Sequence, residues 1–172
     1  MKGKILYTES QKYTQWWLWL IILGLNGFFL VELIINRLNP SNIQNTEDFY
    51  GILVGLIVSF SVTFLIYSIK LRTYITEDGI YIQFFPFHFS FRLYSWDQIS
   101  MLNIRNYSAI VEYGGWGIRY SLSGNGVAYN ISGNIGLQLV LKNNKKILIG
   151  TNNPEELKNI LLSIHKYPLN NN

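Results

Sequence analysis

Residues 16–35 read WWLWLIILGLNGFFLVELII, and residues 50–69 read YGILVGLIVSFSVTFLIYSI. As helices rising 1.5 Å per residue, both stretches are long enough to cross the roughly 30 Å hydrocarbon layer of a bilayer. The first is longer than the apolar core of a secretory signal and lacks a small-residue cleavage site. We therefore expect a transmembrane hairpin over residues 16–69, with helices at about 16–35 and 50–69, after an N-terminal segment over residues 1–15.

The charges favour one orientation of this hairpin. Only 14% of the 172 residues are charged, against about 25% in soluble domains. Basic residues precede the first stretch and follow the second, whereas the connection between them holds one arginine and two acids; the residues are Lys2, Lys4, Lys12, Lys70 and Arg72, against Arg37, Glu47 and Asp48. The positive-inside rule then predicts a multi-pass protein of the cell membrane with both termini in the cytoplasm.

Small residues recur every four positions in the second stretch, at Gly51, Gly55 and Ser59. They share one helix face, and small side chains let another helix approach closely. We expect this face to meet the first stretch at Gly24 and Gly27. The alternative is packing between two copies of the chain, as in a homo-oligomer.

Two polar residues interrupt the first stretch, Asn26 and Glu32. Ionisable groups inside a membrane often mark a functional pathway. This suggests an alternative function, a small membrane sensor or transport-associated subunit that uses the hairpin. Glu32, however, lies near the predicted outer boundary, where its side chain can reach the interface.

Short runs rich in Ile, Val, Tyr and Phe alternate with turn residues after residue 70, a pattern of antiparallel strands. RTYIT and IYIQFF flank the turn EDG, and GLQLVLK and KKILIGT flank the turn NN. The chain ends in a predicted helix, with Asn153 as N-cap, Pro154 at the first position, and apolar residues at Leu157, Ile160, Leu161 and Ile164. We expect about seven antiparallel strands in a small barrel that this helix closes.

The order of these motifs resembles bacterial membrane-anchored proteins with a pleckstrin-homology-like (PH-like) domain. The resemblance covers Leu71 to Lys166 and rests on ITEDGIYI, YSWDQI, YGGWGIR and the Asn-Pro-Glu-Glu helix start. It implies an α+β membrane protein, with the transmembrane hairpin followed over residues 70–172 by a small antiparallel PH-like β-barrel and a C-terminal α-helix. The first hairpin turn is acidic, so the basic phosphoinositide-binding residues of such domains are not carried over.

The sequence offers little for catalysis or cofactors. The glycine-rich stretch over residues 113–133 lacks the Gly-Lys-Ser/Thr of a phosphate loop, and its Asn125-Gly126 pair is a hairpin signal. There is no cysteine, and the two histidines lack metal-ligand spacing. The net charge of +4 is too diffuse for nucleic-acid binding. We expect no enzyme activity and no cofactor.

Aromatic residues supply the candidate contacts. Phe85, Phe87, Phe89 and Phe91 alternate, as on a strand that packs in the core, but Pro86 favours a turn whose phenylalanines contact the membrane or a partner. Trp116 lies between glycines beside Arg119, either as a contact or as a plug at one end of the barrel. We predict a non-catalytic, membrane-anchored binding or scaffold module that recognises a protein or peptide near the inner membrane face through Phe85, Phe87, Trp116 and Arg119.

Overall fold

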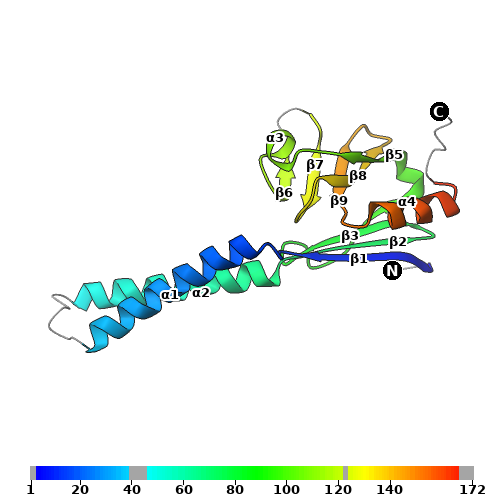
Figure 1. Ribbon diagram of the computed structural model, residues 1–172. Helices are drawn as coiled ribbons and strands as arrows, with labels where there is room; N and C mark the ends of the chain where they lie inside the picture. The colour runs from blue at the N-terminus through cyan, green and yellow to red at the C-terminus, as the bar shows by residue number, and fades with distance from the viewer. Residues whose placement is uncertain (1–2, 39–45, 122–123, 167–172) are drawn as a thin grey trace. The chain divides into compact units, whose positions relative to one another are not determined.

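Two long helices form a hairpin, α1 (Trp16–Leu38) and α2 (Thr46–Ser68) (Figure 1). The computed structural model describes residues 3–38, 46–121 and 124–166. Both helices reach a mean hydropathy of 2.3, and both are long enough to cross a membrane. The prediction of two long apolar helices in a hairpin is therefore confirmed.

The hairpin is one of two units, Tyr13–Ser68, and the β-sheets form the other, from Met1–Lys12 together with Ile69–Asn172. Its first sheet has the order β1-β2-β3-β4, with every neighbouring pair antiparallel. The strands are β1 (Ile5–Lys12), β2 (Lys70–Thr76), β3 (Gly79–Phe85) and β4 (Arg92–Ser95). The expected EDG turn connects β2 to β3, with Glu77 and Asp78 between the strands and Gly79 as the first residue of β3.

Strand β1 lies within residues 1–15, where the sequence predicts only an N-terminal segment. It pairs along its length with β2, with Lys12 opposite Lys70 and Ser10 opposite Arg72. The chain therefore leaves this sheet after β1, forms the helical hairpin, and returns to the same sheet as β2.

The second sheet has five strands in the order β5-β8-β9-β7-β6. These are β5 (Ile99–Asn106), β6 (Gly117–Tyr120), β7 (Val127–Asn130), β8 (Ile135–Leu141) and β9 (Lys146–Gly150). The predicted turn at Asn143-Asn144 joins β8 to β9, and Asn144 adopts a φ of 62°. Pairing is antiparallel except between β7 and β9, which run parallel.

The described residues therefore form two separate sheets, and no closed barrel is found among them. We expected a small barrel with antiparallel strands. The structure instead has two sheets and a parallel β7–β9 pair. An α+β architecture of apolar hairpin, two sheets and C-terminal helix is what the structure supports.

Three short helices complete this unit: a 3-10 turn η2 (Trp96–Gln98), α3 (Ala109–Tyr113) and α4 (Pro154–Ser163). Asn153 occupies the N-cap position of α4 as predicted, but its side chain makes no capping hydrogen bond. Leu157 and Leu161 are buried on the apolar face of α4, and the helix also contacts β1.

Buried side chains from both sheets form the core, and a buried carboxylate connects them. Leu71, Ile80 and Ile82 from the first sheet and Leu139 from the second are fully buried. Glu9 of β1 accepts hydrogen bonds from the Thr151 hydroxyl and the Asn152 amide, both at 2.7 Å, just before α4 begins. The N-terminal strand therefore helps to fix the C-terminal helix.

Candidate functional site

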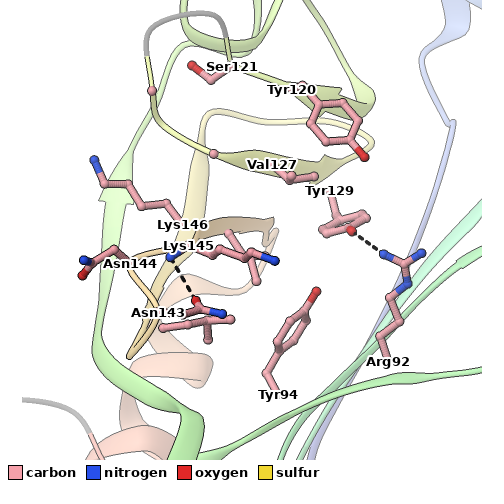
Figure 2. Close-up of a pocket in the computed structure, with 14 residues that line it drawn as sticks. Arg92, Tyr94, Tyr120, Ser121, Val127, Tyr129, Asn143, Asn144, Lys145 and Lys146 are labelled. Atoms are coloured by element: carbon pink, nitrogen blue, oxygen red, sulfur yellow. Dashed lines mark hydrogen bonds between the residues drawn. The ribbon is translucent and has the colours of Figure 1, made fainter.

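A groove of about 680 Å³ opens between strand β4 of the first sheet and strands β7 and β9 of the second (Figure 2). Arg92 and Tyr94 of β4 lie opposite Ile82 and Ile80 in the antiparallel register. Residues that face each other across such a pair project to the same side of the sheet. Because both isoleucines are fully buried, Arg92 and Tyr94 project toward the second sheet and form one wall of the groove.

Tyr129 of β7, in the second sheet, contacts this wall through Arg92. Its hydroxyl accepts a hydrogen bond of 3.0 Å from Nη1 of Arg92, and its ring lies edge-on to the ring of His88. Burial, reinforced by the neighbouring Tyr129 phenol, raises the pKa of Tyr94 above its ordinary value. Burial and the nearby Arg92 lower the pKa of His88, so His88 is neutral at pH 7, and Tyr94 keeps its proton.

The opposite wall is cationic. It includes Lys145 and Lys146 at the start of β9, beside the Asn143-Asn144 turn. The Lys145 amide donates to Oδ1 of Asn143 at 3.1 Å, which shapes that turn. No aspartate or glutamate is among the described residues that line the groove, so Arg92 and the two lysines give it an excess of positive charge.

Strand β4 also offers backbone groups to a ligand. Among the residues that the structure describes, β4 pairs with β3 alone and lies at the end of its sheet. A terminal strand presents unpaired N–H and C=O groups that another extended chain can use. The inter-sheet groove therefore combines an available strand edge, phenol hydroxyls and three cations.

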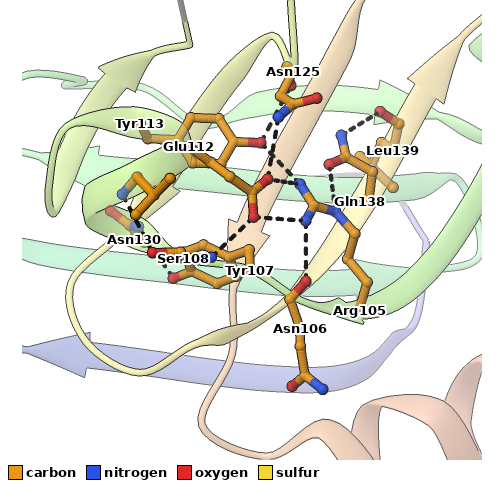
Figure 3. A network of polar contacts seen from close by, with 11 residues as sticks. Arg105, Asn106, Tyr107, Ser108, Glu112, Tyr113, Asn125, Asn130, Gln138 and Leu139 are labelled. Atoms are coloured by element: carbon orange, nitrogen blue, oxygen red, sulfur yellow. Dashed lines mark hydrogen bonds and ion pairs between the residues drawn. The ribbon is translucent and has the colours of Figure 1, made fainter. Parts of the chain in front are cut away.

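A second polar cluster, around Arg105 and Glu112, has a different character (Figure 3). The Arg105 guanidinium forms a two-point ion pair with the Glu112 carboxylate, at 3.2 and 2.7 Å. Glu112 also accepts from the Ser108 amide and from Nδ2 of Asn125. Because these bonds join β5, α3 and the β6–β7 connection and satisfy one another, we assign this cluster to holding α3 on the sheet.

The structure places the predicted site residues in two separate regions. Phe85 ends β3 and is half-buried, whereas Phe87 lies in the turn that follows and is 58% exposed. The continuous strand that would have buried Phe87 in the core is therefore absent, and the alternative turn at Pro86 is the one observed.

Trp116 and Arg119 belong to the second sheet, at the connection into β6. Trp116 is partly buried against a cluster formed by Tyr107, Tyr113 and Leu148. Arg119 is exposed, and its Nε donates to the Trp116 carbonyl at 2.9 Å. Trp116 therefore has a packing role at this position, although the part of the chain that the structure describes forms no closed barrel for it to plug.

Only some of the residues predicted to pack the two helices of the hairpin together are in close contact. An added Cβ at Gly55 would collide with the Phe29 ring, whereas Gly51 has open space around it. Ser59 donates to Oδ1 of Asn26 at 3.0 Å. Gly24 and Gly27, the expected partners, have no neighbour within 4 Å of an added Cβ, so the close approach in α1 occurs at Asn26 and Phe29 instead.

Asn26 is also buried and hydrogen-bonded within the hairpin, to the Ile22 carbonyl and the Thr63 hydroxyl. These contacts account for its presence as a packing residue. Glu32 lies farther along α1, where its backbone carbonyl accepts from Asn36. The sensor or transport alternative, which needs both side chains, stays a prediction.

Sequence reasoning missed the groove itself. Its lining comes from five strands, β4, β6, β7, β8 and β9, and from the turns between them, which are distant in sequence and carry no shared motif. The available signal was the excess of Lys and Arg after residue 70. That signal indicated a cationic unit without indicating which of its side chains converge.

Comparisons with known proteins identify a family for this chain but no activity. A family model described as a family of unknown function (DUF6141) matches residues 6–166. No curated protein and no solved structure matches the chain. The matched residues include the hairpin and both sheets.

Proposed function

The chain belongs to DUF6141, a family of unknown function, and we propose that it is a non-catalytic, membrane-anchored binding module. The ligand is an extended acidic segment of a protein or peptide partner. It binds in the inter-sheet groove and adds as a strand to the edge of β4.

The observation that carries this proposal is the cationic groove beside an available strand edge. Backbone pairing along β4 gives affinity for any extended chain, and side-chain pockets beside the edge give specificity. Arg92, Lys145 and Lys146 supply charge with no acid among the lining residues. Guanidinium and ammonium groups form their strongest hydrogen bonds with carboxylates, which favours glutamate or aspartate in the partner.

Membrane anchoring follows from the hairpin, whose helices have the length and apolarity of spans. Because β1 pairs with β2, the segments before and after the hairpin share one sheet, which supports placing both on one side of the bilayer. The basic residues that flank the hairpin favour the cytoplasmic side. The PH-like resemblance belongs to this proposal as well, since it implies strands followed by a C-terminal helix.

Fluorescence anisotropy with short synthetic peptides tests the binding function on the full chain in detergent. One labelled peptide alternates glutamate with valine, and a second has lysine in place of each glutamate. We expect the acidic peptide to bind and the basic one not to bind. Substituting Arg92→Gln or Lys145→Gln should weaken binding roughly tenfold, the loss that a charged hydrogen bond typically gives.

Lys142→Gln is the matched control, because Lys142 lies close to the same turn and is exposed but does not line the groove. It removes the same charge and should leave the affinity nearly unchanged. Equal losses of affinity for Lys142→Gln and Lys145→Gln would mean that the peptide is attracted by the general positive charge and not by the groove. Failure of the acidic peptide to bind would remove the proposed ligand class.

A further inference from the structure

We infer that the turn after β3, residues Pro86–Phe91, inserts its phenylalanines into the headgroup interface of the bilayer. This inference rests on the proposed membrane anchoring but not on the peptide-binding groove. Phe87 is 58% exposed and Phe89 is 84% exposed. Neighbouring apolar side chains with such exposure mark an interaction surface.

The peptide chain itself limits the distance between this turn and the hairpin. Helix α2 ends at Ser68, Lys70 begins β2, and Phe85 lies directly opposite Lys70. Two residues of chain span at most about 7 Å, and paired strands lie about 5 Å apart. The α-carbon of Phe85 is therefore within about 12 Å of the end of α2, and that of Phe87 within about 20 Å.

The aromatic groups of this end support one another. The Phe89 ring packs edge-on against Phe85, with centroids 6.3 Å apart, and Phe87 lies 6.1 Å from Phe84. Nε2 of Gln83 donates to the Phe89 carbonyl at 3.0 Å, which holds the turn against the sheet. The phenylalanines are thus held in place before they meet a membrane.

Two cations at the same end favour an anionic leaflet. Lys12 and Lys70 face each other across the β1–β2 pair, beside Phe85 on β3. Like charges directly opposite each other destabilise a sheet in water. Anionic headgroups attract basic residues close to a membrane surface, so they would relieve this repulsion while the aromatic rings enter the interface.

Electron paramagnetic resonance on spin-labelled variants tests the inference, because the chain contains no cysteine. Ser90→Cys places a nitroxide between Phe89 and Phe91 without removing a phenylalanine. Val111→Cys, on α3 and 85% exposed, is the aqueous control. Ile57→Cys, on the exposed surface of α2, reports whether the hairpin is inserted.

The labels are compared in nanodiscs of phosphatidylcholine and phosphatidylglycerol by their accessibility to oxygen and to a water-soluble nickel chelate. We expect Ser90→Cys to favour oxygen, and Val111→Cys to favour nickel. Adding Phe87→Ser and Phe89→Ser should shift the position-90 label to the aqueous value. An aqueous label at position 90 beside an inserted label at position 57 would overturn the inference alone, whereas an aqueous label at position 57 would overturn the anchoring on which it rests.

Discussion

Gly126 shows how closely the groove wall is packed around the backbone. It has a φ of +80°, and an added Cβ would collide with the Lys146 carbonyl. Gly124 has the same φ but open space around it. Substituting Gly124 therefore introduces the backbone strain without the collision. We expect Gly124→Ala to cost about 1–2 kcal/mol of unfolding free energy and Gly126→Ala roughly 3 kcal/mol.

Thermal denaturation of the full chain in detergent compares the two alanine variants. The Gly126 variant should also lose affinity for the acidic peptide, because the strand that carries Lys146 must shift. Equal stability of the two variants would contradict the close approach of Gly126 to β9.

Glu112 contributes a pH-dependent part of the stability. The hydrogen bonds from Arg105 lower the pKa of its carboxyl below the ordinary value of 4.5. A lowered folded pKa means that the stabilisation is fully present above pH 4.5 and is lost as the pH falls through the folded value. Because the ion pair is about one quarter exposed, we expect Glu112→Gln to cost only about 1 kcal/mol at pH 7.

Parallel melts of the wild type and Glu112→Gln from pH 7 to pH 3 check this expectation. The difference between the two proteins should shrink as the pH falls below 4.5. A difference that stays constant with pH would show that the carboxylate charge contributes nothing.

At the scale of elements, strand β1 depends on Glu9, which is only 6% exposed. Its carboxylate accepts from Tyr7, Gln11, Thr151 and the Asn152 amide. Glutamine has one acceptor oxygen, and its amide NH2 group is a donor that would face other donors. We therefore expect Glu9→Gln to cost about 2–4 kcal/mol, with proteolysis and melts of the full chain as the measurements.

Ser10→Ala is the control, since Ser10 lies next to Glu9 on the exposed face of the same strand. It should change stability by less than about 0.5 kcal/mol. If Glu9→Gln and Ser10→Ala had the same melting temperature, the hydrogen bonds between β1 and the start of α4 would make no contribution to stability.

Strand β1 also shows why part of the fold escaped prediction. Its buried positions hold Tyr7, Glu9 and Gln11, and the exposed positions between them hold Thr8 and Ser10. A strand is recognised in sequence by apolar residues at every second position. Here the buried face is polar, and Glu9 and Nε2 of Gln11 form hydrogen bonds with Thr151 and the Gly150 carbonyl, so the alternation was hidden.

The elements that were predicted carry local signals. The hairpin helices contain long apolar stretches, the turns at residues 77–78 and 143–144 have turn residues, and Pro154 marks the start of α4. Helix α3 was missed because it spans only five residues, too few for a helical period. The parallel β7–β9 pair, the two-sheet division and the groove depend on contacts between distant segments, which no local pattern encodes.

At the scale of the whole molecule, the proposed anchoring and the β1–β2 pair together predict that both segments that flank the hairpin lie on one side of a membrane. Single cysteines at Ser10 and Ser41 test this in a cysteine-free chain. A membrane-impermeant maleimide added to intact cells should label position 41 and should label position 10 only after lysis. Labelling of both positions, or of position 10 alone, would contradict the proposed orientation.

The central claim is that an acidic segment adds as a strand to β4 in the inter-sheet groove. Amide hydrogen exchange of the full chain in nanodiscs, with and without a saturating concentration of the glutamate–valine peptide, tests it most directly. New backbone pairing should slow exchange within Arg92–Ser95 and leave the edge strand Gly117–Tyr120 unchanged. Unchanged exchange at Arg92–Ser95 under saturation, or protection confined to Gly117–Tyr120, would contradict the claim.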